Sequence, residues 1–480
     1  MKSLVLAEKP SVARDIARVL GCHKNISGAI EGSNYIVTWA LGHLVTLADP
    51  EEYDKKFKAW DMSYLPMVPK KWELVVIKQT SKQYHNVKTQ LFRKDVSEII
   101  IATDAGREGE LVARWILDKS GCHKPIRRLW ISSVTDKAIK EGFAHLKDGR
   151  AYNDLYHAAR SRAEADWLVG INATRALTCK YNAQLSCGRV QTPTLAMIAH
   201  REQQIRSFKP EDYYGLRCTT SVTGGSVGTM ASIVTWTWQQ KKSGSLRSFN
   251  KDLITGLDKK LKNQTLTVTD VHTSSKRTPS PGLYDLTELQ RDANKRFGFS
   301  AKETLNIMQS LYEHHKVLTY PRTDSRYIGT DIVPTIKERL KACNIGPYKK
   351  YIPELLKKPL KTSKAFVDDK KVSDHHAIIP TEEYVQMEHM SNNERKIYDL
   401  VVRRFISVLY PAFEYEQTTL KAEAAGETFT AKGKVIKAAG WKAVYADAVS
   451  SGSSASQYDA YGDYEDSEDL EKISKIMICT

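Results

Sequence analysis

Three carboxylates, Glu8, Asp104 and Glu108, stand just after two short apolar runs of the sequence. Glu8 follows the run Ser3–Ala7, and Asp104 follows the run Val96–Thr103. Because the carboxyl ends of parallel strands meet at the ligand crevice of a doubly wound sheet, these side chains are expected to converge. Carboxylates there suit Mg²⁺, which binds through one or two carboxylates together with phosphate and water. The alternative is that they are solvated turn residues.

A second candidate for chemistry is the segment Tyr320–Ser325, which reads YPRTDS. The residue before a proline is pushed out of the helical conformation, so Tyr320 is expected to be extended. A phenol beside a cation such as Arg322 can attack phosphorus, because the positive charge favours the phenolate and neutralises developing charge. The alternative is ordinary packing, since the chain has 23 tyrosines and most tyrosines are structural.

Recognition of phosphate and bases is suggested by the segment Ser186–Thr194, which reads SCGRVQTPT. Glycine beside arginine lets the backbone approach a phosphate, while the guanidinium supplies a fork of donors. Trp60 and Trp167 could each offer a flat surface on which an unpaired base stacks. The sequence alone favours the alternative that both tryptophans are core residues.

Two adjacent histidines, His375 and His376, precede the residues AIIPT. Imidazoles can move protons or hold phosphate oxygens. Because adjacent side chains point in different directions, at most one of the two is expected to reach a given atom. A polar turn that contains two histidines is the simpler interpretation of this pattern.

Composition narrows the class of protein. The chain has 480 residues, which suggests about three domains, and its 72 basic and 56 acidic residues give a net charge of +16. That excess suits a polyphosphate partner such as nucleic acid. The seven cysteines form no C-x-x-C pair, so a reduced intracellular compartment is expected. The sequence predicts neither a membrane span nor a signal peptide, and it contains no Walker-type ATP motif.

The elements that would position these groups change in type along the chain. Strands and helices alternate over residues 1–150, which predicts an α/β domain with a parallel sheet. Residues 151–205 are expected to be mostly helical, residues 211–275 to form short antiparallel strands, and residues 284–316 to be helical again. Strand patterns return at residues 410–446. Two β segments on either side of a helical block predict one β domain that the chain enters, leaves and re-enters.

Five segments of the sequence carry a family resemblance. They are Ala7–Ser11 (AEKPS), Thr103–Glu110 (TDAGREGE), Gly188–Thr194 (GRVQTPT), Thr319–Ser325 (TYPRTDS) and His376–Thr381 (HAIIPT). Together they resemble the type IA DNA topoisomerases, and the topoisomerase III branch most closely. Each segment alone is a weak match, but the five occur in the order typical of the family. The resemblance extends from Met1 to about Tyr445.

The resemblance implies a fold class: a multidomain α/β, helical and β protein in which a TOPRIM domain joins a toroidal type IA topoisomerase core whose hole holds DNA. The implied domains are the TOPRIM domain at 1–150, an incomplete helical DNA-binding domain at 151–210, a β-rich arch at 211–280 and 400–447, a helical domain with the catalytic tyrosine at 281–399, and a flexible acidic tail at 448–480. Residues 451–480 carry seven acids and two lysines, which is the basis for the acidic tail.

The resemblance also implies roles for single residues. Tyr320 would be the nucleophile that forms a 5′-phosphotyrosine link to one DNA strand. Lys9 would stabilise transition-state charge, and Arg322 would hold the phosphate. One histidine would assist at the phosphate, and His376 is expected because it directly precedes Ala-Ile-Ile-Pro.

The remaining implied roles concern metal and DNA. Glu8, Asp104 and Glu108 would place Mg²⁺, and Glu8 would also act in catalysis. The family usually has a second aspartate where this chain has Gly106, so water replaces that ligand or metal affinity is lower. The implied single-strand groove is lined by Trp60, Trp167, Arg175, Ser186, Cys187, Gly188, Arg189, Val190, Gln191 and Arg322.

The implied activity is transient cleavage of one strand, strand passage and resealing without ATP, which relaxes negative supercoils and decatenates DNA. The implied partners are single-stranded and negatively supercoiled DNA, a RecQ-like helicase and a single-strand-binding protein. The chain would be a cytoplasmic, nucleoid-associated monomer with no membrane contact. Family members usually continue past this length, so a truncated chain with impaired strand passage is also expected.

Two further readings stay open. In the first, the protein is a metal-dependent TOPRIM nuclease or primase in which Tyr320 is structural. In the second, it is a fragment that binds or cleaves single-stranded DNA without strand passage. A tyrosine recombinase would also use tyrosine, arginine and histidine, but it has no need for acids at the strand ends.

Overall fold

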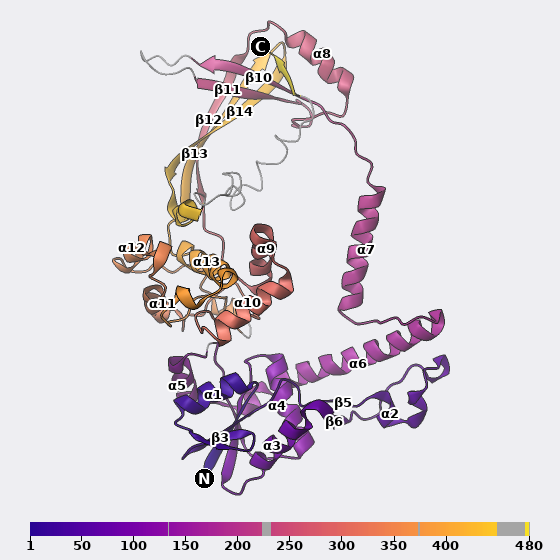
Figure 1. Cartoon of the computed structure of the whole chain (residues 1–480). Coiled ribbons are helices and arrows are strands. Elements are labelled where there is room, and N and C mark those ends of the chain that lie inside the picture. Colours follow the sequence, from indigo (N-terminus) through magenta and orange to yellow (C-terminus); the bar gives the residue numbers. More distant parts are fainter. Residues whose placement is uncertain (133, 223–231, 373–374, 449–475, 480) are drawn as a thin grey trace. The chain divides into compact units, whose positions relative to one another are not determined.

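The chain divides into two compact units. The computed structural model describes every residue except 133, 223–231, 373–374, 449–475 and 480 (Figure 1). The first unit comprises Met1–Ile205 and Gly282–Phe405, and the second comprises Arg206–Pro281 and Ile406–Thr480. Within the described residues, no helix combines the length and apolarity that a membrane crossing requires.

The first unit begins with a seven-stranded sheet in the order β2-β3-β4-β1-β7-β8-β9. The central strand β1 pairs in parallel with β4 and β7, and β7 pairs in parallel with β8. We call residues 1–150 the sheet domain. Its strands are β1 (Lys2–Ala7), β2 (Lys24–Ile26), β3 (Ala29–Glu31), β4 (Tyr35–Trp39), β7 (Val96–Ala102), β8 (Ile126–Arg128) and β9 (Lys147–Asp148), beside a separate pair β5 (Val45–Leu47) and β6 (Leu74–Val76).

Helices cover both faces of this sheet, which explains why its central strands are apolar at consecutive positions. Leu4 and Leu6 of β1 face one core with helices α3 (Ser81–Leu91) and α4 (Arg107–Ser120). Val5, between them, faces a second core with the helices α1 and α5. These two helices span Pro10–Val19 and Asp136–Ala144, and a short helix α2 spans Pro50–Tyr53.

The ends of β1 and β7 are fixed side by side, because Ala7 is the register partner of Ala102. Helix α1 begins at Pro10, a position where the missing N–H of proline costs no hydrogen bond. Helix α4 packs closely under the loop that follows β7: a Cβ on Gly109 would lie 2.1 Å from the carbonyl oxygen of Asp104. Only glycine permits that approach, so the loop is held tightly at the strand end.

Helices make up the rest of the first unit. We call residues 282–405 the helical part; it contains α9 and α10, which carry the chain toward Tyr320. The helices of this unit outside the sheet domain are α6 (Asn153–Tyr181), α7 (Gln191–Ser207), α9 (Leu286–Phe297), α10 (Ala301–Glu313), α11 (Ile336–Ala342), α12 (Ile352–Leu356) and α13 (Asn392–Ser407). None of the residues of α7 is buried.

The second unit is a six-stranded sheet in the order β12-β13-β14-β11-β10-β15. Strand β12 lies before the helical part and pairs antiparallel with β13, which lies after it. One sheet is therefore built from two segments of the chain that the helical part separates in sequence. The strands are β10 (Gly215–Val222), β11 (Ser232–Gln239), β12 (Thr267–Thr278), β13 (Phe413–Ala424), β14 (Glu427–Ala438) and β15 (Ile476–Cys479).

Two segments of the second unit differ from the sequence expectation. Helix α8 (Lys251–Leu261) interrupts the stretch expected to be strands, and it buries Ile254, Leu257 and Leu261. Their helical spacing was the available signal. The expected flexible tail includes β15, which pairs in parallel with β10 because an apolar segment can satisfy the open edge of a sheet. Residues 449–475 of that tail lie outside the described residues.

Candidate active site and DNA-binding residues

A cavity of about 900 Å³ lies in the first unit, at the carboxyl ends of β1 and β7. It receives side chains from the sheet domain, from α6 and from the helical part. Most residues predicted for catalysis and metal binding meet there, although they come from distant segments. The lining includes Glu8, Lys9, His43, Asp104, Glu108, Gln309, Tyr320, Arg322 and His375.

Tyr320 is held at two points by the sheet domain. Its hydroxyl donates a hydrogen bond of 3.3 Å to Oδ2 of Asp104, and its backbone N–H donates one of 3.1 Å to the carbonyl oxygen of Ser132. Burial, and then the charges of Asp104 and Glu8, raise the pKa of the phenol well above its usual value, whereas Arg322 acts in the opposite direction. The expected shift toward phenolate is therefore outweighed by burial and by two carboxylates.

Those two carboxylates interact with each other. Oε2 of Glu8 accepts a hydrogen bond of 3.0 Å from the backbone N–H of Asp104. Burial, and then the charge of Asp104, raise the pKa of Glu8 to about 7. Burial also raises the pKa of Asp104, while Lys9 and the Tyr320 hydroxyl act against that shift. Because two neighbouring carboxylates resist being ionised together, they stabilise a cation that lies beside them.

The third predicted metal ligand, Glu108, lines the same cavity but is paired with two basic side chains. Glu108 lies 3.3 Å from Arg162 and 3.7 Å from Nε2 of His43, and these neighbours hold its pKa below its usual value, His43 having the larger effect. Among the described residues, no three His, Cys, Asp or Glu side chains are grouped as metal ligands. Glu8 and Asp104 fit a two-carboxylate Mg²⁺ site, whereas the expected three-carboxylate set is not formed. A Cβ on Gly106 would meet nothing within 4 Å, which leaves room for water there.

Lys9 is paired with a residue that the sequence reasoning missed. Its Nζ lies 2.5 Å from Oε1 of Glu313, on the last turn of α10. Gln309, one turn earlier, also donates to that carboxylate and lines the cavity. The polar pair at helical spacing shortly before Tyr320 was the signal that could have identified them.

The structure corrects the choice between the two histidines. The ring of His375 lines the cavity and stacks on Tyr320 with centroids 4.2 Å apart. His376 is buried away from the cavity, with its Nδ1 2.7 Å from the carbonyl oxygen of Ala377. The bridge between Leu318 and Pro380 fixes this segment beside the chain that leads to Tyr320, so the two adjacent rings diverge. Burial lowers the pKa of His375 to about 3 and that of His376 to about 4.

A buried arginine fixes the loop that carries Asp104. Arg128, at the end of β8, is fully buried and donates hydrogen bonds to the carbonyl oxygens of Thr103 (2.8 Å) and Asp104 (2.7 Å). Its Nε lies 3.0 Å from the carboxylate of Glu110, which is also fully buried. Arg128 thereby orients the backbone of Asp104, the residue that accepts the hydrogen bond from Tyr320.

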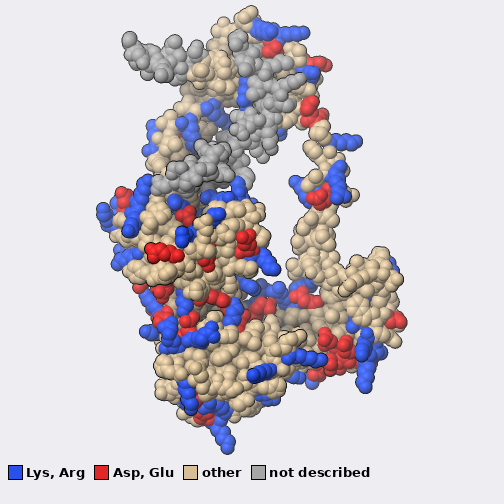
Figure 2. Space-filling model, in the orientation of Figure 1, with Lys and Arg blue, Asp and Glu red and all other residues tan. Residues whose placement is uncertain are grey.

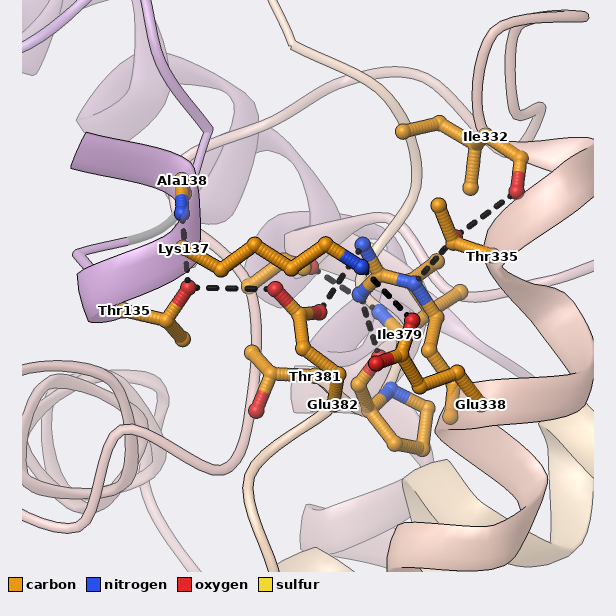
Figure 3. A network of polar contacts seen from close by, with 12 residues as sticks. Thr135, Lys137, Ala138, Ile332, Thr335, Glu338, Ile379, Thr381 and Glu382 are labelled. Atoms are coloured by element: carbon orange, nitrogen blue, oxygen red, sulfur yellow. Dashed lines mark hydrogen bonds and ion pairs between the residues drawn. The ribbon is translucent and has the colours of Figure 1, made fainter. Parts of the chain in front are cut away.

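A polar network joins the sheet domain to the helical part (Figure 3). Thr135 caps α5 and donates to Glu382 over 3.1 Å, and Lys137 lies 2.7 Å from Glu338 on α11. Arg339, which is buried, donates to the carbonyl oxygen of Pro380 over 2.7 Å and lies 3.3 Å from Glu382. The network holds the segment after His375 against the sheet domain.

The two tryptophans predicted to stack on bases, Trp60 and Trp167, differ in their exposure and in their contacts. Trp60 is 51% exposed, and the guanidinium of Arg175 lies 5.0 Å from its ring. Arg175 is buried and donates to the carbonyl oxygen of Phe57, so it supports Trp60 from beneath rather than facing solvent. Trp167 is half-buried: its indole N–H donates to the carbonyl oxygen of Ala48, and its ring packs against Trp72. Trp167 therefore packs against the core and also lines the cavity, and its contact with DNA stays a prediction.

The glycine–arginine loop lies close to the cavity. Arg189 lies 2.7 Å from Asp166, a residue that lines the cavity. The N–H of Cys187 donates to Thr174 over 2.9 Å, and that of Gly188 donates to Thr192 over 3.0 Å. The remaining predicted residues, Ser186, Val190 and Gln191, are exposed, as is Arg322.

On the face of the molecule that Figure 2 shows, positive charge is spread rather than concentrated at one place. In the view of Figure 2, Lys and Arg side chains occur across both units, with acidic side chains between them. The net charge of +16 therefore favours a polyanion in general, and the site itself must be identified from side-chain geometry.

Comparisons with known proteins identify the family of the chain. The profile of the Toprim domain, which typically binds a divalent metal, matches residues 3–134, and that of the DNA topoisomerase family matches residues 150–472. DNA topoisomerase 3 of Bacillus cereus is 64% identical over 444 residues, which cover 92% of this chain and 59% of the relative. DNA topoisomerase 3 of Bacillus subtilis is 60% identical, with 92% and 60% covered.

A solved structure supports the fold. Full-length topoisomerase I from Thermotoga maritima superposes with a TM-score of 0.65 at 23% identity, covering 92% of this chain and 67% of that one. The chain spans about 60% of the length of the curated relatives it matches. From the profile matches and the relatives together, the chain belongs to the type IA DNA topoisomerases, in the bacterial topoisomerase 3 branch.

Proposed function

We propose that this chain cleaves and reseals one strand of DNA by transesterification at Tyr320. The observation that carries the proposal is the meeting of Tyr320, Asp104, Glu8 and Lys9 around one cavity, at hydrogen-bonding distance for Tyr320 and Asp104. A nucleophile, a carboxylate that can accept its proton, an acid with a pKa of about 7 and a cation are the groups that this reaction needs.

In the forward step, the Tyr320 oxygen attacks the phosphorus, and the bond from phosphorus to the 3′ oxygen breaks. The phenol proton passes to Asp104, and Glu8 in its protonated form supplies a proton to the departing 3′ oxygen. Lys9, released from Glu313 by the phosphate, stabilises the charge on the phosphate oxygens, and Arg322 holds the same phosphate. Resealing is the reverse, and because a phosphodiester is exchanged for a phosphotyrosine diester, no ATP is needed.

Mg²⁺ is the proposed metal, held by Glu8 and Asp104. When bound, it supplies positive charge beside the DNA phosphates. The cleavage step uses groups of the chain alone, so the proposal assigns cleavage to these residues and metal dependence to the later passage of a strand.

The proposed substrates are single-stranded stretches of negatively supercoiled or linked DNA, which the activity would relax or decatenate. Unpaired bases would stack on the exposed ring of Trp60, while Arg189 and the loop Ser186–Gln191 would hold the backbone. A RecQ-like helicase and a single-strand-binding protein would generate and cover such stretches. The setting we propose is the cytoplasmic nucleoid, with the protein acting as a monomer.

A second candidate is cleavage or binding of single strands without strand passage. Helix α7 favours it, because this helix buries none of its residues and leaves Leu195, Met197 and Ile198 exposed. Exposed apolar side chains along this helix favour a scaffold that is not held firmly enough for strand passage.

The test uses a labelled single-stranded oligonucleotide, denatured after incubation with the protein, with and without EDTA. A covalent protein–DNA band that is absent in Tyr320→Phe and persists in EDTA supports the proposal. Tyr312→Phe is the matched control, because its ring packs edge-on at 5.4 Å from Tyr320 and the variant keeps the nucleophile. Metal-dependent nicking without a band would indicate a nuclease instead. Relaxation of a supercoiled plasmid then separates the two candidates.

A further inference from the structure

Four aromatic rings form a column that ends at Tyr320. The rings of Tyr152 and Trp130 lie 4.8 Å apart with an interplanar angle of 22°, and those of Trp130 and His375 lie 6.5 Å apart at 16°. His375 and Tyr320 follow at 4.2 Å and 30°. We call these four residues the aromatic column. Tyr152 and Trp130 come from the first 152 residues of the chain, and His375 and Tyr320 come from the helical part.

We propose that Trp130 is a positioning residue, which holds the imidazole of His375 flat against the ring of Tyr320. The inference rests on the proposed function of Tyr320 as nucleophile and assigns a role to a residue in none of the recognised sequence segments. Trp130 would act through His375 and would not itself touch the reacting atoms.

Stacking orients the ring of His375, because its ring nitrogens lack well-formed hydrogen bonds within the described residues. A histidine in an active site is normally fixed by a hydrogen bond from the ring nitrogen that is not reacting. Within the described residues, neither ring nitrogen of His375 makes a hydrogen bond of good geometry, although the Ala105 backbone lies close enough to favour the protonated ring. The side chain is nevertheless only 4% exposed, so packing against flat rings is what sets its plane.

Trp130 is itself well fixed. The guanidinium of Arg128 lies 5.0 Å from its ring, and Arg128 is bound to the carbonyl oxygen of Asp104 over 2.7 Å. The end of β8 therefore sets two neighbours of Tyr320 at once: Asp104 through a hydrogen bond and His375 through a stacked ring. Because both contacts are set from the end of β8, they keep Tyr320 in one geometry. Small displacements of an attacking group lower the reaction rate by large factors.

The test measures the rate of adduct formation at saturating single-stranded oligonucleotide for Trp130→Ala, Trp130→Phe, His375→Ala and the double variant. Trp130→Ala is expected to lower the maximal rate about tenfold or more, while oligonucleotide affinity changes less than about twofold. Trp130→Phe, which keeps a flat ring, is expected to stay within about threefold of the wild type. In the His375→Ala background, Trp130→Ala is expected to cause no further loss.

A matched control separates positioning from general packing. Phe143 pairs edge-on with Tyr35 at 5.7 Å in the same sheet domain and does not line the cavity. Phe143→Ala is expected to lower the melting temperature as Trp130→Ala does but to leave the maximal rate unchanged. The inference is overturned if Trp130→Ala keeps the wild-type rate, if Trp130→Phe fails as badly as Trp130→Ala, or if the losses of Trp130→Ala and His375→Ala simply multiply.

A second readout does not depend on cleavage. In protein labelled with ¹³C-histidine, the Hε1 resonance of His375, assigned by its absence in His375→Ala, is expected to be shifted upfield by the stacked rings. In Trp130→Ala it should move back toward the position of an unstacked histidine. An unchanged resonance would overturn the positioning role. If the wild-type protein forms no adduct, the proposed function is overturned. The resonance of His375 would still show whether Trp130 positions its ring.

Discussion

The hydroxyl of Tyr320 donates a hydrogen bond of 3.3 Å to the carboxylate of Asp104, which stands 216 residues earlier in the chain. This contact joins the proposed nucleophile to the loop after β7 and, together with burial, favours the protonated phenol. A cation near this pair therefore has two effects: it weakens the hold of the carboxylate on the proton and stabilises the phosphate under attack.

Lys9 is the cation of the chain best placed for that task. Replacing it by alanine is expected to lower the rate of adduct formation about 100-fold, the usual cost of losing one donor to a developing charge. Lys2→Ala is the matched control, because Lys2 begins strand β1, which leads to Lys9, and pairs with Glu31 over 2.7 Å without lining the cavity. Equal rates for Lys9→Ala and the control in a single-turnover assay would contradict the role of Lys9.

The raised pKa of Glu8 predicts how stability depends on pH. Folded Glu8 keeps its proton up to about pH 7, whereas its ordinary pKa is 4.5, so the folded state binds more protons in between. The stability that this adds is fully present below pH 4.5 and is lost as pH rises toward 7 and beyond. In EDTA, the melting temperature of the wild type should therefore fall relative to that of Glu8→Gln over this range.

Mg²⁺ should reverse the same trend, because the metal binds the deprotonated carboxylate and releases its proton. Calorimetry below pH 7 in buffers of different ionisation enthalpy is expected to show proton release in the wild type and less in Glu8→Gln. Glu98→Gln, on neighbouring strand β7, is the control and should behave as the wild type. Equal proton release by all three proteins would contradict the link between Mg²⁺ binding and the proton of Glu8.

The exposed ring of Trp60 predicts a contribution to single-strand binding. Trp60→Ala is expected to weaken binding by about 1–3 kcal/mol, the usual range for one stacked base, and Trp60→Phe by less. Met62→Ala, an exposed apolar neighbour on the same loop, should leave the affinity unchanged. Fluorescence anisotropy with a labelled oligonucleotide checks this, and similar losses for Trp60→Ala and Met62→Ala would speak against stacking.

The network of Figure 3 predicts unequal effects on stability for two of its cations. Arg339→Met removes a buried guanidinium, leaves Glu382 without its ion-pair partner and is expected to cost about 3–5 kcal/mol. Lys137→Ala breaks an exposed pair with Glu338 and should cost less than about 1 kcal/mol. Urea unfolding measures both, and a Lys137→Ala loss as large as that of Arg339→Met would contradict this ranking.

The sequence predicts the parts of the site that follow from regular structure. Glu8 and Asp104 could be placed together because parallel strands expose their carboxyl ends at one edge. The contact of Asp104 with Tyr320 could not be derived that way, because it depends on how the helical part packs on the sheet domain. The family resemblance, rather than any local pattern, placed Tyr320 at that cavity.

The sequence could not show which of two neighbouring side chains faces the cavity. His375 and His376 differ by one position, and which of them faces Tyr320 is decided by bridges to Leu318 and Tyr284 in distant segments. Trp167 illustrates the same limit, since its indole N–H is bound by a backbone carbonyl 119 residues away. Long-range contacts of this kind leave no trace in local spacing.

The two attachments of Tyr320 to the sheet domain have a consequence for timing. Once its oxygen is esterified, Tyr320 has no proton to donate to Asp104, and the new diester brings a negative charge beside that carboxylate. The hydrogen bond from its N–H to Ser132 is then the contact that remains of the two. In the proposed reaction, bond formation therefore loosens the boundary between sheet domain and helical part, and resealing tightens it again. The chemical step would itself act as the signal that releases one part from the other.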